Sequence, residues 1–254
     1  MHGLFGEQAI MTIDGYCTLG VDREYDLTAS DLLYGMDRAG VERAVIAPVD
    51  RLLAVNNREG NDFILRAVAD HPDRLIPACA ANPWYGEPAV EEVRRAAGMG
   101  ARPLVLHPFV QGYLANDELV WPLLDAATAE KLPVYVHTGP PGNASPWQVV
   151  DLAERYPLVD FIMGHSGATD FWNDVVDAGM AATNVYLESS LARPFSLAPR
   201  LKVVGMHKGI VGSYAPINEL TFEWEQARRA LPPETWPDIC GGNLLRLLLK
   251  RGPL

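Results

Sequence analysis

The chain has 254 residues, 48% of them hydrophobic, which is enough to bury a large core and is a length typical of a single α/β barrel. Its net charge of −11 argues against nucleic acid or an anionic membrane surface as a main partner, because both require clustered Lys and Arg. The three cysteines are widely spaced and form no Cys-x-x-Cys pair, so the sequence suggests neither a disulfide framework nor a thiolate zinc site and favours a reduced, cytoplasmic location.

Short apolar runs rich in β-branched residues alternate with longer amphipathic stretches along the chain. The short runs are flanked by Gly or Pro, which favours strands over buried helices. The predicted strands cover residues 9–13, 43–47, 75–80, 103–106, 134–137, 159–163, 185–188 and 209–212.

Helical patterns fill the stretches between these strands. The first helix has Thr28 or Ser30 as a candidate N-cap and ends before Gly40, a typical C-cap glycine. Residues 50–60 and 108–116 are predicted as longer loops over one end of the sheet. The remaining helices are predicted at residues 61–70, 88–97, 117–131, 146–156, 169–180, 196–206, 218–230 and 242–249.

Strands that alternate with helices predict a parallel sheet, because each crossover must return the chain over the sheet. Eight such units close into a (β/α)8 TIM barrel. An open doubly wound sheet is the alternative, but residues 15–20 lack the glycine-rich first turn expected of it. We find no internal repeat or linker, so a single domain over residues 1–254 is expected.

Polar residues lie near the ends of several predicted strands. In a parallel barrel the active site is at the carboxyl ends of the strands, so these side chains should converge on one mouth. The residues expected there are Tyr16, Thr18, His107, His137, His165, Glu188 and Tyr214.

Several segments, in order along most of the chain, resemble the amidohydrolase superfamily, in the branch that includes aminocarboxymuconate-semialdehyde decarboxylase. The resemblance implies an α/β fold of the (β/α)8, metal-dependent hydrolase type. The segments that carry it are residues 36–45 (MDRAGVERAV), 71–75 (HPDRL), 132–139 (LPVYVHTG), 164–167 (GHSG), 184–190 (NVYLESS) and 241–243 (GGN).

Members of this family usually have Asp-x-His-x-His at strand one, a histidine at the end of strands five and six, and Gly-Ser-Asp at strand eight. The resemblance implies that the strand-one pair, the strand-five histidine and the strand-eight aspartate hold a zinc-like ion, and that the strand-six histidine is an acid or base. In this sequence the strand-one pair is Tyr16 and Thr18 and the strand-eight position is Tyr214, whereas His137 and His165 are retained.

These departures affect metal binding. A catalytic zinc site needs three protein ligands from Cys, His or carboxylate, and neutral phenols and hydroxyls are poor substitutes. Cys17 and Glu188 could in principle replace the lost ligands, but strand alternation points Cys17 away from the mouth. From the sequence we therefore expect no divalent metal cofactor.

The leading functional hypothesis is a divergent, metal-independent enzyme that acts on a small carboxylated or carbonyl-containing molecule by acid–base chemistry. Decarboxylation, cyclisation, dehydration and hydrolysis all remain open. The predicted catalytic residues are His165, His137 and Tyr214, since histidines can exchange protons and a buried tyrosine can donate to an oxyanion. The predicted substrate-binding residues are Tyr16, Thr18, His107, Glu188 and Arg193.

Other interpretations stay open. The histidines can be structural groups satisfied by hydrogen bonds, Glu188 can form an ion pair with Arg193, and Tyr16 and Tyr214 can simply fill volume. The chain can also be a catalytically silent subunit that binds a ligand or an active homologue, or a hydrolase with a non-standard metal site. A homo-oligomer, or a heteromer with another amidohydrolase-like chain, is compatible with either role.

Overall fold

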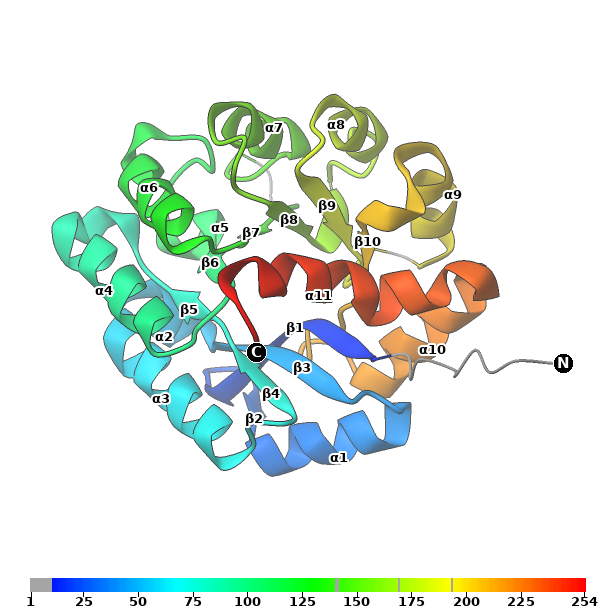
Figure 1. Cartoon of the computed structure of the whole chain (residues 1–254), viewed down its shortest axis with the longest axis horizontal. Helices are drawn as coiled ribbons and strands as arrows, with labels where there is room; N and C mark the ends of the chain where they lie inside the picture. Colours follow the sequence, from blue (N-terminus) through cyan, green and yellow to red (C-terminus); the bar gives the residue numbers. More distant parts are fainter. Residues whose placement is uncertain (1–10, 140–141, 169, 193) are drawn as a thin grey trace, which may run out of the picture.

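Parallel strands surrounded by helices form the structure, a computed structural model that describes residues 11–139, 142–168, 170–192 and 194–254 (Figure 1). The strands pair in the orders β2-β1-β3-β4 and β10-β9-β8-β7-β6-β5. Their bounds are β1 Ile13–Val21, β2 Asp26–Leu27, β3 Arg43–Pro48, β4 Leu75–Pro77, β5 Cys79–Ala80, β6 Leu104–Leu106, β7 Val134–His137, β8 Phe161–Gly164, β9 Val185–Glu188 and β10 Gly209–Ile210.

Backbone hydrogen bonds join the two groups of strands into one barrel. On one side Gly15 N–H donates to the carbonyl of Val211 at 2.8 Å, which connects β1 to the chain that follows β10. On the other side β4 and β5 are separated by Ala78 alone, whose N–H donates to Ile46 of β3 at 2.8 Å. The two strands act as one barrel position, and the predicted (β/α)8 TIM barrel is confirmed.

Helices return the chain along the outside of the barrel, as predicted. The first begins after Thr28, whose side chain accepts the Asp31 N–H, and ends at Gly40 in the left-handed region with φ 69°. The helices are α1 Ala29–Ala39, α2 Asp50–Ala54, α3 Asn57–Asp70, α4 Glu87–Gly98, α5 Pro108–Gln111, α6 Trp121–Glu130, α7 Pro146–Arg155, α8 Val175–Ala181, α9 Pro194–Val204, α10 Leu220–Ala230 and α11 Asn243–Leu248.

Two expectations about elements near the mouth were wrong. The first strand was predicted at residues 9–13, of which 9 and 10 lie outside the described residues. Strand β1 runs from Ile13 to Val21, because pairing with β3 continues past Asp14 through a register shift. The predicted loops at 50–60 and 108–116 contain α2, the start of α3, and α5. Their helical turns bury Leu52 and Leu53 in the first case and Gln111 in the second.

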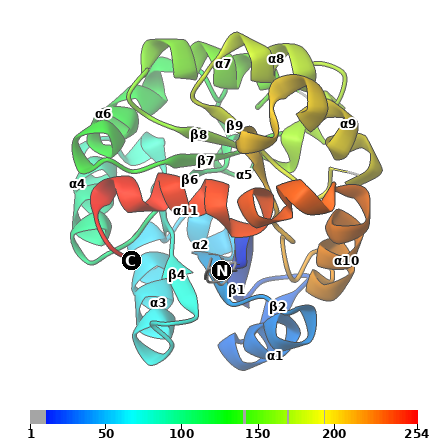
Figure 2. The same cartoon turned by 45° about the vertical axis from the view of Figure 1, so that its right-hand side comes forward.

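Helix α11 closes the amino end of the barrel. Its residues Leu244, Leu247 and Leu248 share a buried cluster with Ile13 and Val45, which lie at the amino ends of β1 and β3. Figures 1 and 2 both show α11 crossing this end of the barrel. Apolar side chains therefore fill the amino end of the barrel, and we look for the functional site at the opposite, carboxyl end. Among the described residues, no helix is both long and apolar enough to cross a membrane.

Candidate active site at the carboxyl ends of the strands

Three histidines meet at the carboxyl end of the barrel. His107 follows β6 and caps α5, His137 is the last residue of β7, and His165 comes directly after β8. The imidazoles of His107 and His137 stack with ring centroids 3.9 Å apart. Nδ1 of His137 lies 2.9 Å from Nε2 of His165, within hydrogen-bond distance. The predicted convergence of these histidines is confirmed by the geometry.

A buried carboxylate lies behind the histidines. Nδ1 of His165 is 2.8 Å from Oγ of Ser190, and Ser190 Oγ–H donates to Oε2 of Glu188 at 2.6 Å. The same oxygen accepts the Tyr135 hydroxyl at 2.8 Å and the His165 backbone N–H at 3.0 Å. Oε1 of Glu188 accepts the Ser190 N–H at 2.6 Å. The carboxylate is thus surrounded by four donors and connected to His137 through a serine and a histidine.

This geometry corrects the expectation that Glu188 binds substrate. Its carboxylate is fully buried and enclosed by donors from β7 and from the turns after β8 and β9, and its contacts are with the residues that hold the histidines. Its expected partner Arg193 lies outside the described residues. Ser190 and Tyr135, which the sequence analysis did not assign to the site, carry the hydrogen bonds.

Burial keeps all three imidazoles neutral near pH 7. Burial lowers the pKa of His107 to about 3, and burial, followed by the proximity of His107, lowers the pKa of His165 to about 3. Burial, followed by the neighbouring histidines, also puts the pKa of His137 well below its ordinary value. Burial raises the pKa of Glu188, while its hydrogen bonds act in the opposite direction. The resting site therefore contains neutral bases.

Two tyrosines complete the ring cluster. Tyr16 of β1 stacks on Tyr135 with centroids 4.4 Å apart and meets His137 edge-on at 4.8 Å. The ring of Tyr214, in the segment after β10, lies 4.6 Å from that of His165. Burial raises the pKa of both Tyr16 and Tyr214, so both keep their hydroxyl hydrogen. They can donate to a developing oxyanion but are not ionised ligands.

Two buried polar atoms of this cluster have no hydrogen-bond partner within the described part of the chain: Nε2 of His137 and the hydroxyl of Tyr16. Buried polar groups are normally satisfied, so such atoms need an explanation. His137 meets Tyr16, and His165 meets Tyr214, through ring contacts, and the two histidines are within hydrogen-bond distance of each other. The two free atoms are candidates for contact with a bound molecule.

The backbone is strained where the strands end. His165 has φ 64°, Ser166 φ 43°, Leu191 φ 56° and Tyr214 φ 58°, all in the left-handed region that non-glycine residues rarely adopt. Each such residue costs of order 1–3 kcal/mol, and such positions cluster at functional sites. Here the strain orients His165 and Tyr214 into the ring cluster, which favours a functional interpretation over leftover polar groups.

Strand β1 is fixed by a carboxylate that the sequence analysis did not single out. Asp14 is fully buried and accepts the backbone N–H groups of Tyr16 at 3.1 Å and Ser213 at 3.0 Å. Its other oxygen accepts Nε1–H of Trp224, on α10, at 2.7 Å. It therefore holds the Tyr16 backbone beside the segment that carries Tyr214. An ionisable residue inside an apolar strand was the available sequence signal.

Thr18 and Cys17 do not contribute free polar groups to the ring cluster. The Thr18 hydroxyl donates to the carbonyl of Ala215 at 3.5 Å, so its role as a substrate-binding residue has no support from its contacts. Cys17 packs with the layer between strands and helices, apart from the cluster that contains Tyr16, as strand alternation predicted. Burial raises the pKa of its thiol well above the ordinary value, so it is not a ready nucleophile.

Asp50, at the start of α2, places negative charge beside the tyrosines. Burial and the charge of Asp22 raise its pKa to about 6, while a hydrogen bond from Tyr25 lowers it. The charge of Asp50 contributes to the raised pKa of both Tyr16 and Tyr214.

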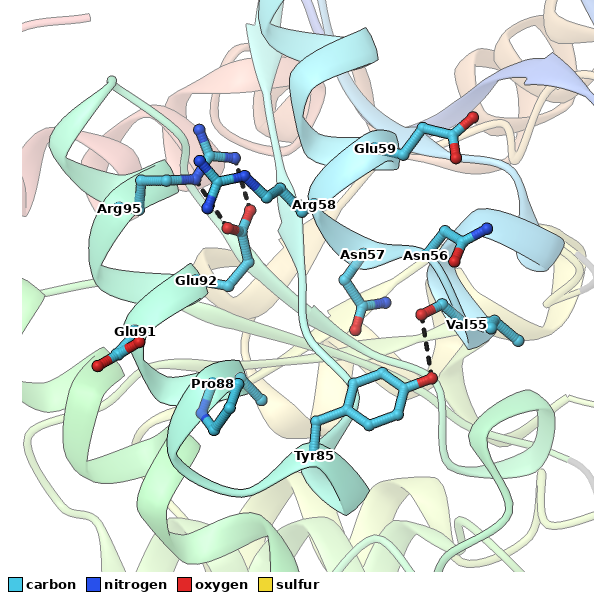
Figure 3. A pocket seen from close by; sticks show the side chains of 11 residues that line it. Val55, Asn56, Asn57, Arg58, Glu59, Tyr85, Pro88, Glu91, Glu92 and Arg95 are labelled. Carbon is cyan, nitrogen blue, oxygen red and sulfur yellow. Dashed lines mark hydrogen bonds and ion pairs between the residues drawn. The ribbon is translucent and has the colours of Figure 1, made fainter.

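A cavity of about 600 Å³ lies apart from the histidines, on the outer side of the barrel between α3 and α4 (Figure 3). Arg95 crosses it in ion pairs with Glu92 and Asp62, both at 2.7 Å. At its edge the Tyr85 hydroxyl donates to the carbonyl of Val55 at 3.0 Å. None of the predicted site residues lines it.

The family model described as Amidohydrolase matches residues 19–248. No curated protein matches the chain. Similar solved structures include 5-carboxyvanillate decarboxylase from Sphingomonas paucimobilis, which is 16% identical, with 94% of this chain and 99% of that chain covered and a TM-score of 0.76. The decarboxylase of the same name from Novosphingobium aromaticivorans, with bound manganese, is 16% identical over 96% and 98% of the two chains, with a TM-score of 0.77. A dihydroxybenzoic acid decarboxylase from Polaromonas, with bound manganese and 2-nitroresorcinol, is 16% identical over 95% and 98%, with a TM-score of 0.73.

These structures contradict the expectation of no metal cofactor. Two of the similar proteins carry manganese, which points to a divalent metal in this group of enzymes. The ligands missing from one sequence do not reveal what its relatives bind. The donor set nevertheless does not fit such an ion, because the described residues contain no group of three or more His, Cys, Asp or Glu side chains that could hold it. Nε2 of His137 is one available nitrogen, and we derive no reaction step through a metal.

Proposed function

Because the chain belongs to the amidohydrolase family, we propose that its barrel mouth is an acid–base site that removes carbon dioxide from a small carboxylated aromatic molecule. The similar structures named for decarboxylases motivate the reaction class. One observation supports the site: a chain of hydrogen bonds runs from Glu188 through Ser190 and His165 to His137 and ends at a buried, unpartnered nitrogen.

His137 is the proposed proton carrier. A substrate hydroxyl next to the carboxylate gives its proton to Nε2 of His137, and the resulting imidazolium delivers it to the ring carbon that bears the carboxylate. The bond from this carbon to the carboxyl group then breaks, its electron pair returns to the ring, and carbon dioxide leaves. The product hydroxyl regains its proton from water, so one proton is consumed for each carbon dioxide released.

The neighbouring side chains have supporting roles in this proposal. Tyr16 and Tyr214 keep their hydroxyl hydrogens and can donate to the substrate oxygen that becomes negative. His107 accepts the Val110 N–H through Nδ1, so its hydrogen is on Nε2 and it too is a donor. The site thus offers one acceptor, Nε2 of His137, beside the donors Tyr16, Tyr214 and His107. This set suits an aromatic acid with an adjacent hydroxyl group.

The test is carbon dioxide release from a panel of hydroxylated benzoates, including 2,6-dihydroxybenzoate and 5-carboxyvanillate. The protein is assayed as purified, after chelation and after addition of manganese. In deuterium oxide the product should carry one deuterium at the carbon that lost the carboxylate, seen by NMR. His137→Ala should lower the rate by about 10²- to 10⁴-fold, as for other general acid–base groups. His207→Gln, an exposed histidine, is the matched control.

Absence of release from every substrate under all three metal conditions would refute the proposal, as would full activity of the double variant His137→Ala/His165→Ala. A second candidate, a silent subunit that binds a ligand without turnover, is supported by the burial of the whole ring cluster. Stoichiometric binding of 2-nitroresorcinol by calorimetry, together with no release from the panel, would favour that role.

A further inference from the structure

The protonation pattern of the histidine pair follows from the hydrogen bonds behind it. Both oxygens of Glu188 accept backbone N–H groups, one from His165 and one from Ser190, so both act as acceptors. Ser190 has a single hydroxyl hydrogen, and the 2.6 Å contact with Oε2 of Glu188 requires it there. The four donors around Glu188 favour the ionised carboxylate, which has no hydrogen of its own, so the hydrogen between the two oxygens comes from the serine.

The remaining assignments follow one after another. With its hydrogen given to Glu188, the Ser190 oxygen must accept at its 2.8 Å contact, so Nδ1 of His165 carries a hydrogen. His165 is buried, which favours the neutral imidazole, and in that form its Nε2 has no hydrogen and can only accept. Nδ1 of His137, 2.9 Å away, must then donate. His137 is buried as well, and in its neutral form Nε2 then carries a lone pair.

We infer that Ser190 and Glu188 are positioning residues that hold both His165 and His137 in the Nδ1–H form, so that Nε2 of His137 faces its ligand as a proton acceptor. This inference rests on the proposed function for its catalytic meaning. The hydrogen-bond argument itself is independent of the reaction. Without the serine, neutral imidazoles could reverse direction, and the outward nitrogen would become a donor.

Groups on every neighbouring element agree with this direction. Tyr135 of β7 donates its hydroxyl hydrogen to Glu188, so it does not compel Ser190 to turn its own hydrogen away from the carboxylate. Tyr16 and Tyr214 contact the histidines through their rings and keep their own hydrogens. His107 stacks on His137, and the charge it would carry if protonated disfavours protonation of the pair. The carboxylate of Glu188 is therefore what sets the direction of the chain.

Nitrogen NMR of protein labelled with ¹⁵N-histidine measures the pattern directly. At pH 7.5 the wild-type protein should show protonated Nδ1 and bare Nε2 for both His137 and His165. The signals are assigned by comparison with His137→Gln and His165→Gln. Ser190→Ala should transfer part or all of the hydrogen of His137 to Nε2. Ser189→Ala is the matched control, because this buried neighbouring serine bonds to the backbone of Gly212 and not to the histidines.

Activity gives a second readout. Ser190→Ala should lower kcat by about 10- to 100-fold, as for other groups that orient a catalytic histidine, with a smaller change in KM. A wild-type spectrum with protonated Nε2 on His137 would overturn the inference even if Ser190→Ala does not fold. An unchanged histidine pattern in folded Ser190→Ala would also overturn it. The expected spectrum without carbon dioxide release would refute only the proposed function, and release with the opposite spectrum would refute only the positioning role.

Discussion

Acidification should destabilise this protein through its buried histidines, and His107 offers the cleanest measurement. Burial lowers the pKa of His107 to about 3, whereas a histidine in an unfolded chain titrates near 6.5. The unfolded state therefore takes up a proton first as the pH falls. Stability from this group is fully present above about pH 6.5 and is lost progressively between about pH 6.5 and pH 3.

The size of the loss follows from the two pKa values. At pH 4 the histidine is protonated in the unfolded chain and mostly neutral in the folded protein. Because pH 4 lies about 2.5 pH units below the unfolded-state pKa, the unfolding free energy falls by about 3 kcal/mol. Asp14 and Glu188 contribute with the opposite sign, because burial raises the pKa of both carboxyls. We therefore compare the unfolding free energy that the wild-type protein loses on acidification with the unfolding free energy that His107→Gln loses.

Urea unfolding at pH 7.5, 6, 5 and 4 measures this difference. Between pH 7.5 and pH 4 the wild-type protein should lose about 3 kcal/mol more unfolding free energy than His107→Gln. The exposed His207→Gln is the control and should follow the wild-type curve. Equal losses in the wild-type protein and His107→Gln would show that His107 is not held neutral by burial, and the account of a site made of neutral bases would fail.

Three further changes test the packing around the site. Gly164→Ala places a Cβ against the ring of Tyr135 and should lower the unfolding free energy by about 1–3 kcal/mol through overpacking. The near-UV circular dichroism should change as well, and an unchanged spectrum would contradict the packing of this ring. Asp14→Ala leaves three buried N–H donors without a carboxylate and should lower the unfolding free energy by about 3 kcal/mol or more in urea titrations; a loss below about 1 kcal/mol would contradict its structural role. Lys208→Met removes the donor to the carbonyls that end α8, at 2.7 and 2.6 Å, and should lower the thermal midpoint, whereas an equal or higher midpoint would contradict the capping role.

The alternation of strands and helices was predictable because local signals repeat at each unit. Thr28 and Gly40 bound α1 as their side-chain and backbone preferences require. The strand at residues 134–137 was predicted with its observed bounds. Strand β1 was misplaced for a non-local reason: Asp14 and Gly15 look like a turn locally. The partners of Asp14, Ser213 and Trp224, are about 200 positions away in the sequence.

The histidines of the site were predictable from their positions at strand ends, but the hydrogen bonds that connect them to each other and to Glu188 were not. His137 and His165 follow apolar strands, which is enough to place them at one mouth. Whether Glu188 faces a ligand or the histidines depends on the left-handed turn at His165 and Ser166, which no local residue preference requires. Ser190 gave no signal of its own, because a serine after a strand is compatible with many structures.

The charge distribution explains why a proton carrier suits this mouth. Glu188 is buried, and in the described part of the chain its ion-pair contact is with His165, which is neutral at rest. A buried carboxylate without a cation is stabilised by hydrogen bonds, but a nearby positive charge would stabilise it further. In the proposed reaction, a proton taken from the substrate by His137 supplies that charge, and His165 and Ser190 connect the imidazolium to the carboxylate. The site thus gains electrostatic stabilisation at the moment when the substrate becomes more negative, which is the differential binding that a decarboxylation by acid–base chemistry requires.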